Sequence, residues 1–243
     1  MLKKTNQFVL FFCGFSYLCS MIIEPVAFFH SPLTSKFGIP RQSGLAPELR
    51  GTIVLTPEFR QVEAVRGLEG FDYLWLIWEF SANGDRQKLT ARPPRLGGNE
   101  RMGVFATRSP FRPNRMGLSC VRLDRIDYED KHAPVLHVMG ADLMDGTPIY
   151  DIKPYVAYAD AHPEARCGFV DSNEWQPLEV IIPDSLCSRF SGEELSALRD
   201  VLAQDPRPPF HHDPSRVYGM PFGGADVRFV VNGGVLHVTD ITE

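Results

Sequence analysis

Up to about residue 160, hydrophobic residues fall into short runs that are separated by turn-forming residues. The runs are rich in Val, Ile, Phe, Trp or Tyr, and Gly, Pro, Asn or Asp stands at their ends, which is typical of strands. The predicted strands are Ile22–Phe29, Gly51–Leu55, Tyr73–Phe80, Gly103–Thr107, Ser119–Ile126, Val135–Gly140 and Pro148–Ile152. In this region only residues 57–65 have the pattern of a short helix. Many short strands joined by turns indicate an antiparallel barrel or sandwich.

The pattern changes after residue 160, where a polar stretch without periodicity, residues 161–176, predicts a linker. Ser191 and Glu194 then form a capping-box pattern before a helix that has hydrophobic residues on one face and ends at a proline-rich segment. An Asn-Gly pair at 232–233, between two alternating runs, predicts a hairpin. We therefore expect a small α+β subdomain over residues 177–243.

Residues 1–20 do not fit the strand pattern. Two lysines precede an apolar run over residues 8–19, which has the layout of a signal peptide but is too short for a membrane span. A second methionine, Met21, directly precedes the first predicted strand. We interpret residues 1–20 as an upstream extension of the reading frame, with a targeting segment as the alternative. The expectation is a cytoplasmic protein without membrane contact, whose first domain spans residues 21–160.

The composition is that of a globular protein, with 44% hydrophobic and 23% charged residues and a formal net charge of −5. Proteins that coat nucleic acid without discrimination are usually basic, so any contact with nucleic acid must come from a local patch. The five cysteines are scattered, without a Cys-x-x-Cys pair or a matching histidine spacing. We therefore expect reduced cysteines and no bound metal.

One segment, Arg92–Arg115, is strongly basic within this acidic chain. It contains six arginines, no lysine and one acidic residue, Glu100. Arginine presents a planar fork of donors that matches phosphate and carboxylate groups. Prolines stiffen the segment and glycines permit close approach, so it suits an anionic ligand held in a fixed pose. The alternative is a solvated basic face that is balanced by carboxylates elsewhere.

Two further segments contain candidate ligand-binding residues. The Asp-Gly pair at 145–146 is a strong turn signal, and it is either an ordinary hairpin connection or a turn that presents Asp145 to a polar ligand. Lys153 and Tyr155 would then bring a cation and an aromatic face nearby. The Pro-Arg-Gln triplet at 40–42 is a weak motif, so an ordinary loop is its alternative. Nucleophile elbows, phosphate loops, dinucleotide-binding glycine motifs and zinc-protease motifs are absent from the sequence.

Together these segments resemble the TsaA-like (YaeB-like, TrmO-type) β-barrel family, the tRNA threonylcarbamoyladenosine N6-methyltransferases. The matching segments are FGIPRQSGL, AVRGLEGFDYLW, RPPRLGGNERMGVFATRSPFRPNRMGLS, DLMDGTPIYDIKPY and VLAQDPRPPF. The resemblance implies a single-sheeted antiparallel β-barrel that forms a homodimer and binds S-adenosyl-L-methionine in a cleft completed by the neighbouring subunit. It also implies a tRNA substrate, which is methylated on N6 of threonylcarbamoyladenosine next to the anticodon.

The resemblance also implies functions for individual residues. By motif, the cofactor site contains Pro40, Arg41, Gln42, Phe80, Ser81, Arg108, Leu118, Asp145, Gly146, Thr147 and Pro148. The expected contacts to tRNA come from Arg95, Arg112, Arg115, Lys153 and Arg207. The catalytic candidates are Asp145, Lys153 and Tyr155. The Asp-Pro-Arg-Pro pattern at 205–208 indicates the tRNA-type subfamily rather than barrel-only relatives.

The implied acceptor is a ureido N–H with a delocalised lone pair, and such a weak nucleophile must lose its proton as the new bond forms. Asp145 and the substrate's own carboxylate are the candidate bases. We hypothesise that Arg112 or Lys153 binds that carboxylate or a nearby phosphate, and that Tyr155 stacks on the base. The alternatives are a barrel that binds RNA without catalysis and a methyltransferase for a small metabolite on the same barrel.

Overall fold

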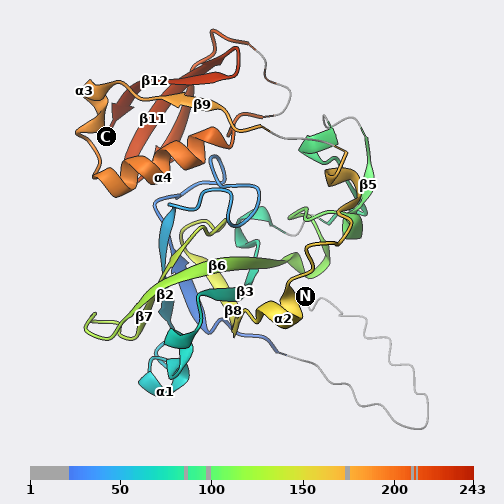
Figure 1. The fold of residues 1–243 in the computed structure, drawn as a ribbon, viewed down its shortest axis with the longest axis vertical. Coiled ribbons are helices and arrows are strands. Elements are labelled where there is room, and N and C mark those ends of the chain that lie inside the picture. Colours follow the sequence, from blue (N-terminus) through green and yellow to red (C-terminus); the bar gives the residue numbers. More distant parts are fainter. Residues whose placement is uncertain (1–21, 85–86, 97–99, 173–175, 209–210, 212) are drawn as a thin grey trace, which may run out of the picture.

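The computed structural model describes residues 22–243 except 85–86, 97–99, 173–175, 209–210 and 212, and only the backbone of Arg95. Figure 1 shows a barrel below a smaller sheet, with one long helix on the side of that sheet that faces the barrel. The expected extension over residues 1–20 lies outside the described residues. Within the part that is described, no helix has the length and hydropathy needed to cross a membrane.

Six antiparallel strands close the barrel in the order β1-β2-β7-β6-β3-β8. They are β1 (Ala27–His30), β2 (Arg50–Leu55), β3 (Tyr73–Glu79), β6 (Met116–Asp127), β7 (Val135–Met139) and β8 (Thr147–Pro154). Alternate residues point inward, so that Leu74, Leu76 and Trp78 of β3 are buried in the barrel core. The predicted single-sheeted antiparallel barrel is confirmed.

Short helical turns and one small hairpin fill the barrel connections and the segment that follows β8. They are α1 (Val62–Val65), η1 (Leu68–Gly70), η2 (Ser81–Asn83), β4 (Thr90–Ala91), η3 (Pro94–Leu96), β5 (Met102–Gly103), η4 (Val104–Ala106), η5 (Pro113–Arg115), α2 (Ala157–Asp160) and η6 (Gly168–Val170). The strand predicted over Gly103–Thr107 is wrong after its first residue. The Thr107 hydroxyl and N–H both donate to the Val104 carbonyl, which closes a helical turn instead.

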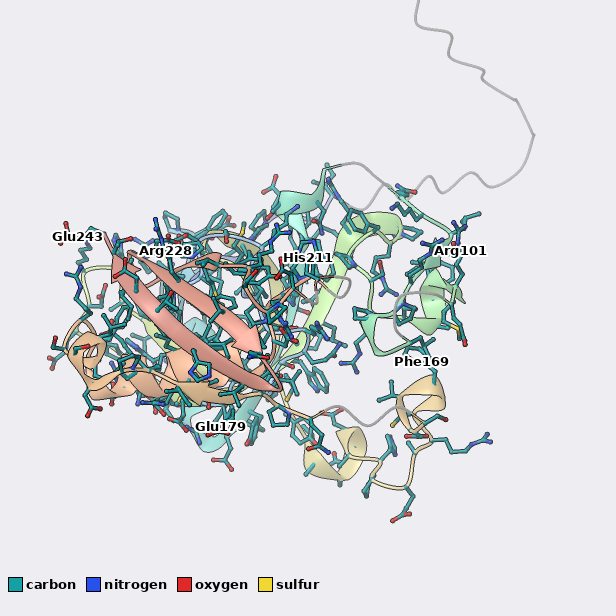
Figure 2. The ribbon with its side chains drawn as sticks, turned by 90° about the horizontal axis from the view of Figure 1, so that it is seen from above. Arg101, Phe169, Glu179, His211, Arg228 and Glu243 are labelled. Atoms are coloured by element: carbon teal, nitrogen blue, oxygen red, sulfur yellow. The ribbon has the colours of Figure 1, made fainter. Side chains whose placement is uncertain are left out.

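The C-terminal subdomain has a four-stranded sheet in the order β10-β11-β12-β9, seen from above in Figure 2. Its elements are β9 (Glu179–Ile181), α3 (Asp184–Cys187), α4 (Gly192–Ala203), β10 (Tyr218–Phe222), β11 (Ala225–Asn232) and β12 (Val235–Thr242). Both hydrogen bonds of the predicted capping box are present at Ser191 and Glu194. The hairpin turn is Gly233-Gly234, one residue later than predicted, because Asn232 still pairs with Val235. The predicted α+β subdomain is confirmed.

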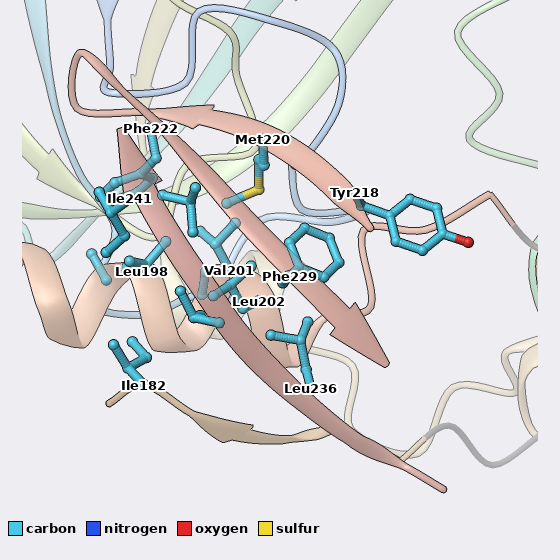
Figure 3. Packing of buried hydrophobic residues seen from close by; sticks show 14 of the residues in the cluster. Ile182, Leu198, Val201, Leu202, Tyr218, Met220, Phe222, Phe229, Leu236 and Ile241 are labelled. Carbon is cyan, nitrogen blue, oxygen red and sulfur yellow. The ribbon is translucent and has the colours of Figure 1, made fainter. Parts of the chain in front are cut away.

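The β1–β2 connection of the barrel belongs to the hydrophobic core of the C-terminal subdomain, which is separate from the core inside the barrel. Leu198, Val201 and Leu202 of α4 pack against the sheet, as Figure 3 shows, and the same cluster includes Leu33 and Leu49 from the β1–β2 connection. The cluster therefore fixes the connection that contains the Pro-Arg-Gln triplet. Polar contacts add to it, since the Asp200 carboxylate accepts from the Glu48 N–H at 3.0 Å and the Gln204 amide donates to the Leu45 carbonyl at 2.9 Å.

Three long connections gather at one end of the barrel, the end nearer the C-terminal subdomain. Strands β1, β3 and β7 run in the same direction in the closed sheet, so their carboxyl ends lie at the same end. The connections that follow them are residues 31–49, 80–115 and 140–146. The last of these crosses the barrel end, because β7 and β8 are not neighbours in the sheet.

Candidate functional site

A cleft of about 1470 Å³ opens beside this end of the barrel. Its walls come from residues 88–94, 101–102 and 105–111, from Arg41 and Gln42 of the β1–β2 connection, and from residues 167–170. Arg101 and Phe169, which belong to different walls, are labelled in Figure 2. Residues 167–170 lie within the predicted linker, so this segment contributes to a candidate site as well as joining the two parts.

The lining of the cleft is cationic and partly apolar. Its charged residues are Arg41, Lys88, Arg92, Arg101 and Arg108, and no described lining residue is acidic. Two large apolar side chains of the same lining are highly exposed, Leu89 at 84% and Phe105 at 79%. Arginine forks beside exposed apolar surface suit an anion that also has a ring or an aliphatic chain.

Arg108 and the Pro-Arg-Gln triplet meet at the inner side of the cleft. The Arg108 guanidinium donates to the Gln42 side-chain oxygen, although 66 positions separate them in sequence. Pro40 is buried, and the following Ser43 accepts a hydrogen bond from the Cys120 N–H of β6 at 3.2 Å. The barrel wall therefore holds this loop in place. The structure also brings together Arg41, Gln42 and Arg108, three residues that the resemblance assigned to the cofactor site.

A polar chain runs from the barrel interior toward this loop. The Trp78 indole N–H donates to the Ser119 hydroxyl at 2.9 Å, and that hydroxyl donates to the Asp142 carboxylate at 2.5 Å. Burial raises the pKa of the Asp142 carboxyl, while the Ser119 hydrogen bond and the positive charge of Arg108 act in the opposite direction. Neither Ser119 nor Asp142 was among the predicted site residues.

The turn at 145–146 lies on the β1 side of the barrel end. The Asp145 carboxylate contacts His30 Nδ1 at 3.2 Å and accepts from the Ser31 N–H at 3.1 Å. Gly146 has a φ of 74° and donates its N–H to the Phe29 carbonyl at 2.8 Å. Gly146 also lines a separate pocket of about 240 Å³, and neither turn residue lines the cationic cleft.

Thr147 and Pro148 follow this turn at the start of β8, and both are buried. The Thr147 hydroxyl donates to the Met144 carbonyl at 2.7 Å, which closes the turn from inside. Thr147 therefore stabilises the turn in this chain, and the exposed Gly146 is the member of the motif that lines a pocket.

Three other predicted residues lie on the outer face of the barrel, around β3. Leu118 on β6 pairs with Ile77, and Lys153 on β8 pairs with Trp75, so both are outward neighbours of β3. Leu118 is 57% exposed, and the Lys153 ammonium contacts the Asp151 carboxylate at 2.8 Å. Tyr155 packs edge-on against Tyr73, with ring centroids 6.1 Å apart.

The three catalytic candidates do not meet within one chain. Asp145 precedes β8, whereas Lys153 lies near its far end, and an extended strand of eight residues spans roughly 25 Å. Proximity in sequence therefore does not produce proximity in space here, because the intervening residues form a strand. Asp145 can act together with Lys153 and Tyr155 only if the two groups come from different subunits.

The rim of the barrel beside the cleft is tied together by an ion pair. Glu79 at the end of β3 accepts from Arg115 at 2.8 Å and from the Tyr150 hydroxyl at 2.5 Å. Burial and this carboxylate raise the pKa of Tyr150 to about 12. Phe80 packs against Trp78, with ring centroids 4.3 Å apart, and the exposed Ser81 follows it at the start of η2.

The arginines that were expected to contact tRNA differ in their surroundings. The Arg207 guanidinium donates twice to Asp205, at 2.8 and 2.9 Å, and its side chain is only 14% exposed. Arg115 pairs with Glu79, and Arg112 donates to the Thr107 carbonyl at 3.1 Å. The side chain of Arg95 lies outside the described residues.

Several residues of the cleft region were not anticipated. They are Ser43, Lys88, Leu89, Phe105, Ser119, Asp142 and Phe169. The available signal was their position next to motifs that were identified, since Ser43 follows the Pro-Arg-Gln triplet and Asp142 precedes the Asp-Gly turn. Among the described residues, no group of three or more His, Cys, Asp or Glu side chains is placed to hold a metal ion.

Two family models match this chain and together cover most of it. The model of the tRNA-methyltransferase O N-terminal domain matches residues 28–161, and that of the TrmO C-terminal domain matches residues 176–243. The chain is similar in structure to the crystal structure of TrmO from Pseudomonas aeruginosa, with a TM-score of 0.76 and 35% identity. That match covers 93% of this chain and 100% of the other.

Two bacterial relatives add to these matches. The chain is 38% identical over 224 residues to the tRNA (adenine(37)-N6)-methyltransferase of Escherichia coli, which covers 88% of this chain and 94% of the relative. It is 42% identical over 215 residues to RcsF of Pseudomonas aeruginosa, whose name places it among the S-adenosylmethionine-dependent methyltransferases. The second match covers 85% of this chain and 91% of the relative.

Proposed function

The chain belongs to the tRNA-methyltransferase O family of S-adenosylmethionine-dependent enzymes, and we propose that its acceptor is N6 of threonylcarbamoyladenosine next to the anticodon. The name of the Escherichia coli relative gives adenine at position 37 as its target. The observation that carries the proposal is the cationic cleft. Arg41, Gln42 and Arg108 meet at its inner side, and the exposed Arg92 and Arg101 line it beside exposed apolar surface. An adenosine that bears a carboxylate side chain needs such a mixture of charge and apolar contact.

The residues present fit S-adenosyl-L-methionine. Its methionine carboxylate matches the arginine forks at Arg41 and Arg108, and its amino and ribose groups match the amide oxygen and N–H of Gln42. Outward-facing Leu118 offers apolar contact on the adjoining wall of the barrel. When bound, the cofactor supplies an electrophilic methyl group on a sulfonium, and the chain contributes the alignment of the acceptor with that group.

The acceptor N–H must lose its proton as the new bond forms, and two carboxylates are the proposed bases. Asp145 is held by His30 and the Ser31 N–H, so its oxygens have a fixed direction. The threonyl carboxylate of the substrate is the other candidate. Under this proposal, Arg112 or Lys153 binds that carboxylate or a nearby phosphate, and Tyr155 stacks on a base.

We further propose that the enzyme works as a homodimer in the cytoplasm. The arrangement of the motif residues supports a shared site, because Asp145 and Gly146 lie apart from the cleft that Arg41 and Arg108 line. A second subunit that places its Asp-Gly turn against the cleft would complete the residue set. The exposed Leu89 and Phe105 also suit coverage by a partner surface.

Calorimetry with S-adenosyl-L-methionine separates the enzyme from the alternative, a barrel that binds RNA without catalysis. The wild-type chain is expected to release heat with a saturating 1:1 stoichiometry per chain. Arg108→Ala should weaken binding by at least about tenfold, since a charge-assisted hydrogen bond is lost. Arg66→Ala is the matched control, because Arg66 pairs with Glu63 on the surface and does not line the cleft. An absence of heat with the wild-type chain would favour the RNA-binding alternative.

A further inference from the structure

A tight turn with an uncommon backbone conformation follows the last residue of α4. Gln204 caps the helix, and the next residue, Asp205, has a φ of 48°, in the left-handed region that L side chains rarely adopt. Glycine is the usual residue at such a helix end, because it takes this conformation without strain. An aspartate at this position therefore indicates that its side chain has a role that glycine could not provide.

The Asp205 side chain fixes the turn through an ion pair with Arg207. The Arg207 guanidinium donates to both oxygens of the Asp205 carboxylate, at 2.8 and 2.9 Å, in the planar fork geometry that makes such pairs strong. The Arg207 backbone N–H donates to the same carboxylate at 3.3 Å, and Pro206 between the two residues has a restricted φ. These contacts compensate for the strained conformation and hold the Asp205 backbone in one orientation.

The turn meets the β1–β2 connection through the backbone carbonyl of Asp205. This carbonyl accepts from the Arg41 guanidinium at 3.5 Å, across 164 positions of sequence. Next to it, the buried Gln204 side chain donates to the Leu45 carbonyl at 2.9 Å, which holds the same connection against the end of α4. The C-terminal end of a helix carries partial negative charge, so this position favours a guanidinium electrostatically as well as by the hydrogen bond.

Arg41 connects this contact to the candidate cofactor site. It is exposed and lines the cationic cleft, and the neighbouring Gln42 accepts from Arg108. A long, exposed side chain loses conformational entropy when a ligand fixes it. A carbonyl that holds the guanidinium before the ligand arrives reduces this cost and so increases the affinity.

We propose that Asp205 and Arg207 are positioning residues of the cofactor site, because their ion pair holds the turn whose carbonyl orients Arg41 for cofactor binding. The proposal rests on the proposed function of the cleft. It gives the Asp-Pro-Arg-Pro pattern at 205–208 a role within the chain, in place of the direct contact with tRNA that was expected of Arg207. None of the described residues that line the cleft belongs to residues 177–243, so the C-terminal subdomain acts on the cofactor through Arg41.

Calorimetry with S-adenosyl-L-methionine on the full-length chain tests this inference. Asp205→Ala and Arg207→Ala should each raise the Kd about fivefold, the effect of weakening one hydrogen bond. Asp205→Asn should keep the Kd within about twofold of the wild-type value, because asparagine also tolerates the left-handed conformation and keeps an acceptor oxygen for Arg207. Asp226→Ala is the matched control and should leave the Kd unchanged. Asp226 also pairs with the arginine two residues after it, at 3.2 Å, but this pair lies on β11 and does not line the cleft.

A double-mutant cycle with Arg41→Ala then separates positioning from a general loss of stability. In the Arg41→Ala background, Asp205→Ala should change the Kd by less than about twofold, because residues that act through one contact are not additive. An unchanged Kd in Asp205→Ala and Arg207→Ala, or full additivity with Arg41→Ala, would overturn the inference. If the wild-type chain itself does not bind the cofactor, the proposed function fails instead, so the two failures are distinguishable.

Discussion

The arginine side chains fall into two groups, those that pair with carboxylates of the same chain and those that line the cleft. The Arg115 guanidinium pairs with Glu79 at the end of β3 and so joins two segments, whereas the Arg207 guanidinium pairs locally with Asp205, two residues before it. Arg92 and Arg101, in contrast, are exposed and line a cleft whose described lining has no acidic residue. A basic sequence segment thus contains both structural cations and cations that are available to an anionic ligand, and only the fold separates them.

This difference predicts that substitution of one arginine lowers the affinity for tRNA and substitution of another lowers the stability of the fold. Arg101→Ala should weaken tRNA binding and reduce the slope of log affinity against log salt by about one, as expected when one phosphate contact is lost. Arg207→Ala should leave that slope unchanged but lower the free energy of unfolding by about 1–2 kcal/mol, because a partly buried carboxylate loses its partner. Filter binding at several salt concentrations, together with urea unfolding, measures both. An unchanged salt slope in Arg101→Ala would contradict the assignment of the cleft to RNA.

At the scale of elements, three connections at one end of the barrel create the candidate site. The β1–β2 connection is fixed on both sides, by Cys120 of β6 and by the hydrophobic cluster that includes α4. Gly38 in this connection has a φ of 95°, and a Cβ atom there would overlap the Met220 side chain of β10. The position therefore requires glycine for two reasons, backbone conformation and close packing.

Alanine substitutions at Gly44 and Gly38 separate the cost of backbone strain from the cost of overlap with Met220. Gly44→Ala should cost about 1 kcal/mol, because Gly44 has a φ of 80° but no neighbouring atom within 4 Å of a Cβ. Gly38→Ala should cost about 2–4 kcal/mol, because strain and overlap add. Urea unfolding of both variants measures the difference. Equal costs would mean that the β1–β2 connection is not packed against β10 as described.

The strands could be predicted from the sequence because each has an internal pattern. In β3, for example, buried Leu74, Leu76 and Trp78 alternate with more exposed neighbours. The cleft could be predicted only in part. Its arginines were visible as a run, but the contact between Gln42 and Arg108 depends on closure of the barrel, which no local pattern encodes. The grouping of Asp145 with Lys153 failed within one chain because the residues between them form a strand.

At the scale of the whole molecule, the barrel and the C-terminal subdomain are connected through the site. Leu33 and Leu49 of the barrel connection share a core with Leu198 and Val201 of α4, and residues 167–170 form a wall of the cleft. The C-terminal subdomain therefore positions the loop that contains Arg41 and Gln42, as well as extending the surface next to the cleft. This arrangement fits an enzyme whose substrate is a folded RNA larger than the cleft itself.

The central claim, methyl transfer to threonylcarbamoyladenosine in tRNA, is tested most directly by mass spectrometry of tRNA nucleosides. Total tRNA is incubated with the full-length chain and S-adenosyl-L-methionine, digested, and compared with a reaction that lacks the cofactor. We predict that threonylcarbamoyladenosine gains the mass of one methylene unit while unmodified adenosine does not. A gain on another nucleoside alone, or no gain on any nucleoside by a chain that binds the cofactor, would contradict the claim.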